Sequence, residues 1–456
     1  MNRRRSGGQI PKGTILSTEV IVLLSASVAF VLSWLVQPHF RSLGFLTGIV
    51  DHPGYRRSHS EPVPRTGGMA IFISFFVTLY ILDYLVLTEP LPWSWLAALG
   101  GSGLAILALG VGDDRFHIHA EKKLYGQLIV ILGLMLVGQR LTTVVLPLAG
   151  AVDLGGWAWP VTLLWYLGFI NSMNLIDGLD GLASGIGVLA TICIAAVAFM
   201  MEDFFSLLFA STLGGASLAF LYWNVSKRKI FLGDSGSMWM GLVLASLLLH
   251  LGQRNGISLL LLLAPMVVPI WDTGTTIIRR YRKRASIFEA DDYHLHHRLV
   301  RLGFQPSSTV RLLLLITAGS VLFALSDSLS IPWLGLPALA CFLWPVQIWV
   351  DRRRGEGAEP ALDFFSELLF VLGLDDKVED TFRRRRRQVA EIIDIQAERN
   401  KVSRVMTAAA GAHAQAEVVD HPAEAKPLNR SVPASTDDPE TGPDNVVLTT
   451  SRRVPD

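Results

Sequence analysis

The stretch FLGDSGS, from Phe231 to Ser237, places one carboxylate, Asp234, between small residues where a long hydrophobic run begins. The basic segment Lys227–Lys229 comes just before it, so Asp234 is predicted to lie at a membrane–water boundary, on the cytoplasmic side. Glycines beside an acid permit close backbone approach and turn geometries that a side chain would block. A helix N-cap is the simpler interpretation of a single such aspartate. Acidic or histidine clusters recur at the same boundary, however, and they favour a functional site.

The composition is that of a membrane protein. Of the 456 residues, 51% are hydrophobic and 17% are charged, whereas soluble domains carry about 25% charged residues. The apolar residues gather into runs of roughly 17 to 25, which are long enough to cross a bilayer. The two cysteines lie inside such runs, so the sequence predicts no disulfide framework.

These runs predict an all-α fold, a polytopic membrane bundle of about eleven transmembrane helices. The predicted spans are 18–37, 67–87, 93–111, 124–137, 157–170, 182–201, 204–223, 237–253, 257–278, 310–326 and 331–350. The predicted domains are an N-terminal polar segment (1–17), a transmembrane domain (18–350), a charged helical extension on the cytoplasmic side (351–407) and a disordered tail (408–456).

The basic residues predict the orientation. If successive loops alternate between the two faces of the membrane, one face receives most of the arginines and lysines, and the other receives only Arg140 and Arg254 between spans. By the positive-inside rule the first face is cytoplasmic, which puts the N-terminus outside. Arg3–Arg5 and Lys12 dissent, because they would then lie outside, but the later loops outweigh them.

With this orientation, every unusual polar motif falls on the cytoplasmic side. The five motifs are Asp51–Gly54 with Arg56, His59 and Pro64–Gly68; Gly112–Arg115; Asn171–Gly181; the stretch around Asp234; and Asp291 and Asp292 with His294–Arg298. Their recurrence on one face indicates a single shared site.

The residue types in these motifs suit phosphoryl transfer from a nucleotide substrate. The adjacent acids Asp113 and Asp114 repel each other and prefer a shared proton or a cation. Carboxylate oxygens at a wet interface suit Mg²⁺ or Mn²⁺, which can bridge substrate phosphates and orient an in-line attack. Arginines and histidines of the first and fifth motifs supply positive charge for phosphate oxygens. Asn171, Asn174 and Asp177 recur every three residues, so on a helix they would share one face and suit recognition of a sugar or base.

Each motif also has a simpler interpretation. The pair Asp113–Asp114 alone is typical of a solvated helix end. The run Asp177–Gly181 partly matches a calcium loop but lacks the alternating oxygen ligands and the closing Glu. The histidines of His294–His297 could bind zinc, although they lack a cysteine and a helical i, i+4 pair.

Two functions of other classes are alternatives to phosphoryl transfer. An ion-coupled membrane transporter would cluster its charges near the bilayer midplane. In this sequence the acids gather at the ends of the spans, and Asp272, which lies within a span, is the exception. The second alternative is an inactive assembly scaffold. The presence of all the motif acids and histidines argues against it.

In this order the five motifs resemble those of the bacterial polyprenyl-phosphate N-acetylhexosamine-1-phosphate transferases, over residues 51 to 302. The pattern His-Leu-His-His at His294–His297 is that of the N-acetylhexosamine branch, whereas the peptidoglycan relatives carry three consecutive histidines. The resemblance implies a helical transmembrane bundle with a cytoplasm-facing active-site cleft, in agreement with the predicted spans. The extension beyond Val350 is not covered by the family pattern.

The resemblance also implies roles for individual residues. The implied catalytic residues are Asp113, Asp114, Asp234 and His297, and the implied metal ligands are Asp234, Asp113 and Asn174. Phe231 matches the aromatic residue that stacks on uracil in relatives. The resemblance and the need for positive charge beside phosphate oxygens together give the expected substrate-binding residues. They are Phe231, Asn171, Asn174, Asp177, Asp180, Arg56, His59, His294, His296 and Arg298.

The activity that follows from the resemblance is transfer of N-acetylhexosamine 1-phosphate, with N-acetylglucosamine as the first choice, from a UDP-sugar to undecaprenyl phosphate. UMP would be released and a lipid-linked cell-surface glycan started, such as an O-antigen, an exopolysaccharide or a wall polymer. The expected cofactor is Mg²⁺, with Mn²⁺ as a substitute. The expected partners are the UDP-N-acetylhexosamine, undecaprenyl phosphate, membrane lipid and a second copy in a homodimer, and no nucleic acid. The expected location is the bacterial inner membrane, with the active site facing the cytoplasm.

Overall fold

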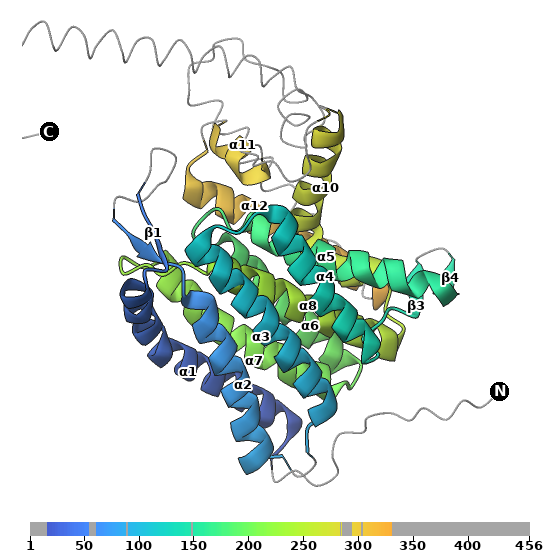
Figure 1. Ribbon diagram of the computed structural model, residues 1–456. Coiled ribbons are helices and arrows are strands. Elements are labelled where there is room, and N and C mark those ends of the chain that lie inside the picture. Colours follow the sequence, from blue (N-terminus) through green and yellow to red (C-terminus); the bar gives the residue numbers. More distant parts are fainter. Residues whose placement is uncertain are drawn as a thin grey trace, which may run out of the picture. The chain divides into compact units, whose positions relative to one another are not determined.

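A computed structural model describes residues 16–53, 61–87, 90–146, 149–282, 284, 294–301 and 304–330 of the chain. These residues form an α-helical bundle, as the apolar runs predict (Figure 1). The helices of its first part are α1 (Thr18–Thr47), α2 (Gly67–Leu85), α3 (Trp93–Phe116), α4 (Ala120–Leu136), the 3₁₀ turn η1 (Gly155–Trp157), α5 (Ala158–Ile176) and α6 (Leu182–Met200). Those of the second part are α7 (Phe204–Val225), α8 (Gly233–Asn255), α9 (Leu259–Leu263), the 3₁₀ turn η2 (Ala264–Met266), α10 (Val267–Arg282), α11 (Leu295–Arg301) and α12 (Pro306–Ser328).

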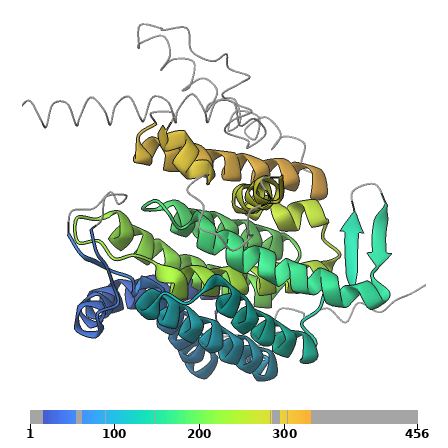
Figure 2. The ribbon, with the colours of Figure 1, turned by 45° about the horizontal axis from the view of Figure 1, so that its top comes forward.

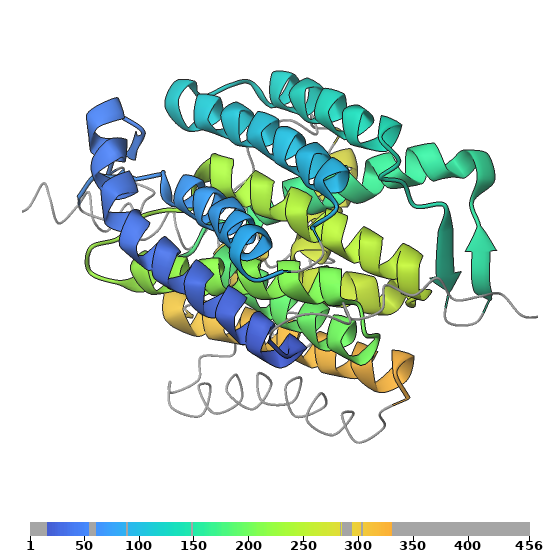
Figure 3. The same cartoon turned by 90° about the horizontal axis from the view of Figure 1, so that it is seen from below.

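Eight helical segments of the described chain are long and apolar enough to cross a membrane. They are α1, α2, α3, α6, α7, α8, the segment Leu259–Arg282 that contains α9 and α10, and α12. α4 and α5 pack into the same bundle but do not meet the length and hydropathy of these eight. α12 runs along one edge of the bundle, beside α6 (Figure 3). The chain is therefore a polytopic, all-α membrane protein.

The first ten predicted spans all fall on helices, although some boundaries were wrong. The span 157–170 belongs to α5, which continues to Ile176, and the span 124–137 belongs to α4, which begins at Ala120. The span 257–278 was predicted as one helix and is interrupted at η2, where Pro265 has no N–H to donate. The eleventh span (331–350), the extension (351–407) and the tail (408–456) lie outside the described residues, as does most of the segment 1–17.

α8 is the central helix of the bundle. Almost all of its residues are buried, and it packs against α3 and α5 and also contacts α2 and α6. Small residues at its start allow backbones to touch: a Cβ atom on Gly68 of α2 would overlap Gly236, and one on Gly110 of α3 would overlap Ser235. The first turn of α8, with Asp234, is therefore held directly against the backbone of two neighbouring helices.

The first loop is closed by two short strands, β1 (Val50–Asp51) and β2 (Val63–Pro64), which pair antiparallel with Val50 opposite Pro64. The chain after β2 then runs beside the stretch that precedes α8. The Phe231 N–H donates to the carbonyl of Pro64 (2.8 Å), and the Gly67 N–H donates to the carbonyl of Phe231 (3.0 Å). Main-chain hydrogen bonds thus join two motifs that lie far apart in the sequence.

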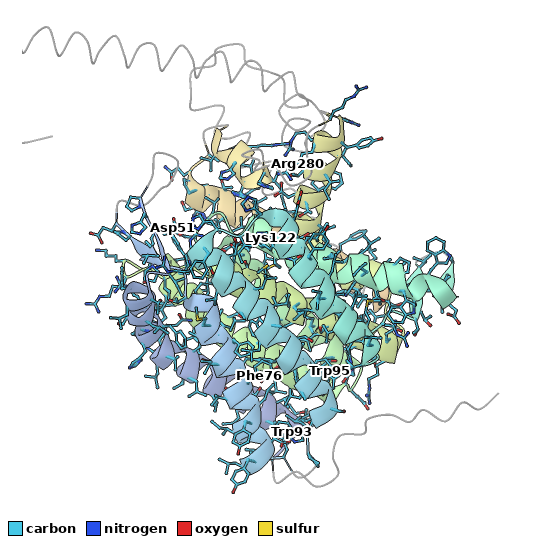
Figure 4. The ribbon with its side chains drawn as sticks, viewed as in Figure 1. Asp51, Phe76, Trp93, Trp95, Lys122 and Arg280 are labelled. Carbon is cyan, nitrogen blue, oxygen red and sulfur yellow. The ribbon has the colours of Figure 1, made fainter. Side chains whose placement is uncertain are left out.

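A second antiparallel pair, β3 (Thr143–Leu146) and β4 (Gly150–Asp153), follows the C-terminal end of α4 and projects from the helices (Figure 2). The Gln253 side chain anchors it: its oxygen accepts from the Thr142 N–H (3.0 Å) and its nitrogen donates to the Thr143 carbonyl (2.6 Å). Asp51, Lys122 and Arg280 lie toward one end of the bundle and Trp93 toward the other (Figure 4). We call the first the polar end and the second the hairpin end.

Candidate active site

The polar end holds a cavity of about 400 Å³ to which several of the predicted motifs contribute. Its lining includes Asp51, Asp177, Asp180, Phe231, Asp234 and His297. These side chains come from the first loop, the turn between α5 and α6, the residues at and just before the start of α8, and α11. The structure therefore brings together candidate residues from four motifs. Arg56 and His59 of the first motif lie outside the described residues.

Beside this cavity, three oxygen atoms converge on the ammonium group of Lys123 from α4. The Lys123 Nζ donates to Asp113 Oδ2 (2.8 Å) and Asn174 Oδ1 (2.9 Å), and also to Asp234 Oδ2. The three acceptors come from α3, α5 and α8, so the lysine ties three helices to a fourth. Lys123 was not predicted as a site residue, because the sequence shows it only as one basic residue of a loop.

The donor set around Lys123 Nζ fits a hard divalent cation. Two carboxylates and one amide oxygen already surround a positive charge, and Mg²⁺ needs only one or two protein carboxylates besides waters and substrate phosphates. Within the described residues, no group of three or more His, Cys, Asp or Glu side chains is arranged to hold a metal ion. The predicted ligands are thus two carboxylates, of Asp113 and Asp234, and one side-chain amide oxygen, of Asn174, without a third acid.

Asp114 has different surroundings from its neighbour Asp113. Its two carboxylate oxygens accept the backbone N–H groups of Asp234 (3.0 Å) and Ser235 (3.1 Å). The first N–H groups of a helix have no partner within the helix, so Asp114 caps α8 from α3. Arg65 lies 3.6 Å from the same carboxylate and also forms an ion pair with Asp51. The adjacent acids therefore divide: Asp113 faces Lys123, and Asp114 holds the start of α8.

Asp234 is not a helix cap, which was the simpler interpretation of its sequence context. The N-cap position of α8 is Leu232, and the Asp234 side chain points to Lys123. Gly233 adopts φ +75°, a left-handed conformation that favours glycine, and a side chain there would meet the Arg65 carbonyl and the Asp114 carboxylate. The glycine before Asp234 is thus required by the turn that presents this carboxylate.

The predicted ladder of Asn171, Asn174 and Asp177 is only partly helical. α5 ends at Ile176, so Asp177 follows the helix as its C-cap residue. The two asparagines do share a face, and both contact α4: Asn171 Nδ2 donates to Gln127 Oε1 (2.8 Å), one turn away from Lys123. Asn171 therefore lies behind the site, held by Gln127, whereas Asn174 lies within it.

Asp177 and Asp180 lie on the turn between α5 and α6 and line the cavity. Asp180 forms an ion pair with Lys229. Burial raises the pKa of Asp177 to about 8, and the carboxylates of Asp234 and Asp114 add to this rise. Asp177 is therefore largely protonated at neutral pH, and a cation bound beside it would favour its ionised form.

The histidine motif packs onto the same turn. His296 is 1% exposed, and a Cβ atom on Gly178 would overlap its Nε2 atom. Burial, followed by the neighbouring His297 and His294, lowers the pKa of His296 well below its usual value, so this ring is neutral at pH 7. Neither of its ring nitrogens has a hydrogen-bond partner among the described residues. His297 lines the cavity, and Arg298 is buried on α11.

Known proteins resemble this chain in sequence. Residues 95–252, from α3 to α8, match the model of glycosyl transferase family 4. A Bacillus subtilis protein described as a probable undecaprenyl-phosphate N-acetylglucosaminyl 1-phosphate transferase is 34% identical over 297 residues, which are 63% of this chain and 81% of that protein.

Two further relatives cover a larger share of the chain. A Mycobacterium tuberculosis decaprenyl-phosphate N-acetylglucosaminephosphotransferase is 30% identical over 344 residues, 70% of this chain and 85% of its own length. An Escherichia coli undecaprenyl-phosphate alpha-N-acetylglucosaminyl 1-phosphate transferase is 27% identical over 351 residues, 71% of this chain and 93% of its own length.

Proposed function

Because the chain belongs to glycosyl transferase family 4, we propose that it transfers N-acetylglucosamine 1-phosphate from its UDP-sugar to undecaprenyl phosphate and releases UMP. The convergence of Asp113, Asn174 and Asp234 on one positive charge, beside a cavity lined by Phe231, is the observation that carries this proposal. The names of the three relatives, which specify N-acetylglucosamine and undecaprenyl or decaprenyl phosphate, support the sugar and the polyprenyl phosphate.

In the proposed reaction, an oxygen of the lipid phosphate attacks the phosphorus that carries the sugar. A new phosphorus–oxygen bond forms, the bond to the uridine-bearing phosphate breaks, and the electron pair leaves with UMP. A phosphate monoester is largely ionised at neutral pH, since its second pKa is near 6. The attacking oxygen therefore needs positioning and charge neutralisation more than it needs a general base.

Six residues of the site have roles in this proposal. Asp234, Asp113 and Asn174 would hold Mg²⁺, which when bound supplies positive charge to the diphosphate. Lys123 supplies a further positive charge next to the same oxygens. Phe231 lines the cavity, where its ring would stack on the uracil. His297 lines the same cavity and would donate to phosphate oxygens.

The proposed location is the bacterial inner membrane, with the polar end in the cytoplasm. Lys122 lies at this end, and Lys123 and Lys229 pair with the cavity residues Asp234 and Asp180, whereas the hairpin end carries Arg140 and Arg254. Positively charged loops stay on the cytoplasmic side during membrane insertion. A cytoplasmic site would also have direct access to a soluble nucleotide sugar.

The test is UMP release by the purified protein with undecaprenyl phosphate, Mg²⁺ and a panel of UDP-sugars. We expect release that requires the lipid, the metal and UDP-N-acetylglucosamine, and that falls at least about 100-fold in Asp234→Asn, because a charge-stabilising group is lost. Glu121→Gln, a change of an exposed acid on the same polar end, is the control and should retain activity. Folded protein that releases no UMP from any of the donors would contradict the proposal.

A further inference from the structure

Asp272 is a buried acid to which the proposed reaction gives no role. It lies on α10, inside the membrane-spanning segment Leu259–Arg282, and the residue is only 2% exposed. An acid inside such a segment is costly unless its oxygens are satisfied by the protein. Its partners therefore indicate why it stands there.

Both oxygens of Asp272 accept hydrogen bonds from the first residues of the histidine motif. Oδ2 lies 3.0 Å from Nδ1 of His294, and Oδ1 accepts the backbone N–H of Leu295 at 2.6 Å. His294 is itself 6% exposed, so the pair is shielded from water. α10 and α11 also both pack against α12, which keeps them adjacent (Figure 2).

These contacts determine the protonation pattern of the His294 ring. A carboxylate can only accept, so Nδ1 of His294 must carry a hydrogen, and Nε2 of the neutral ring is left as an acceptor. A hydrogen bond of this kind also fixes the orientation of the ring. Asp272 thus selects one tautomer and one orientation of His294.

The His294 ring is the first of a row that leads to the cavity. It lies parallel to the ring of His296, with centroids 6.0 Å apart and an angle of 5° between the planes. The ring centroids of His296 and His297 are 4.2 Å apart, and His297 lines the cavity with Asp177 and Asp234. A substitution of Asp272 that reorients the His294 ring would therefore also shift the packed rings of His296 and His297, and the latter lines the cavity.

We propose that Asp272 is a positioning residue of the transferase: it fixes the tautomer of His294 and, through the Leu295 N–H, the placement of α11 over the cavity. The inference rests on the proposed function, because that function gives His297 its substrate. It assigns to α10 a part in the site that none of the five sequence motifs contains.

The decisive variant is Asp272→Asn. The amide oxygen can still accept the Leu295 N–H, but the amide nitrogen would face Nδ1 of His294 and donate to it, which forces the ring hydrogen onto Nε2. Loss of a carboxylate that orients a metal-bound histidine typically costs about 10- to 100-fold, and by analogy we expect a decrease of this size in kcat. In ¹⁵N NMR spectra of histidine-labelled protein, one histidine should change from the Nδ1–H to the Nε2–H form.

Asp83→Asn is the matched control. Asp83 also accepts one backbone N–H, from Leu91 at 2.6 Å, and one ring N–H, from Trp93 at 3.1 Å, but it lies at the hairpin end. If Asp272 acts only through stability, Asp272→Asn will lower Tm, and kcat per folded molecule will stay at the level of Asp83→Asn, which overturns the proposal. We expect similar Tm values and a loss of kcat in Asp272→Asn alone.

His294→Phe gives a second test, which does not depend on the folding of a single variant. Because Asp272 is proposed to act through His294, the losses of kcat in Asp272→Asn and His294→Phe should not add in the double variant. Additive losses, or an unchanged histidine spectrum in Asp272→Asn, would overturn the proposal. Wild-type protein without UMP release would contradict the transferase function instead, and the NMR comparison would still decide the tautomer.

Discussion

The Lys123 side chain makes more polar contacts within this site than its place in the sequence indicates. Its ammonium lies between Asp113 and Asp234 and also binds Asn174, so without it two carboxylates would face each other across the site. We expect Lys123→Met to lower kcat for UMP release by about 100-fold, since a preorganised charge is removed from the reacting phosphates.

Lys122→Met is the control for this prediction. Lys122 is adjacent in the sequence and carries the same charge, but its side chain is exposed. Isolated surface substitutions usually change little, so this variant should behave as wild type. Equal losses in the two variants would mean that the net charge of α4 matters and that the position of the ammonium does not.

At the scale of elements, the start of α8 depends on an acid from another helix. Asp114→Ala removes the acceptor of two backbone N–H groups, which should cost about 1–3 kcal/mol for each buried donor left unsatisfied. We therefore expect a lower Tm for Asp114→Ala, measured by thermal unfolding in detergent.

Asp113→Ala is the natural comparison, because the two residues are adjacent. Asp113 faces Lys123 and the proposed metal position, so its loss should weaken Mn²⁺ binding, measured by electron paramagnetic resonance, more than it lowers Tm. The two variants should thus separate a capping acid from a metal ligand. Indistinguishable changes in both measurements would refute this division of the pair.

At the scale of the whole molecule, the prediction concerns orientation in the membrane. In a background without the native cysteines, Lys122→Cys at the polar end should react with an impermeant maleimide only in inverted vesicles. Asp153→Cys, on β4 at the hairpin end, should react in intact cells; both positions are exposed. The opposite labelling pattern would place the site outside the cytoplasm and contradict the proposed location.

The sequence predicted the membrane bundle well because hydrophobicity is a property of composition over a long window. It predicted helix ends less well where polar residues continue a helix: α5 extends through Asn171 and Asn174 because these side chains bond to Gln127 and Lys123 of α4. Such partners are tertiary contacts, which the local sequence does not contain.

The same reason explains what was predicted of the site. The motifs around Asp113 and Asp234 could be found because several acids and glycines cluster in a short stretch. The roles of Lys123 and of Asp114 as a cap could not be found, because each depends on a residue more than a hundred positions away, Asp234. The difference between two adjacent acids is set by the direction in which each leaves α3.

The backbone pairing between residues 64–68 and 231–232 has a consequence for how this site tolerates change. Main-chain atoms make these contacts, so the hydrogen bonds do not use the side chains of the two segments, although Gly67 and Gly68 leave no room for a Cβ atom. They are sensitive to the number of residues, because an insertion or deletion in either segment would move every donor past its acceptor. Outside Gly67, Gly68 and Phe231, replacements there should be accepted more readily than changes of length, and the spacing between Pro64 and Gly68 is the quantity to preserve when the first loop is redesigned.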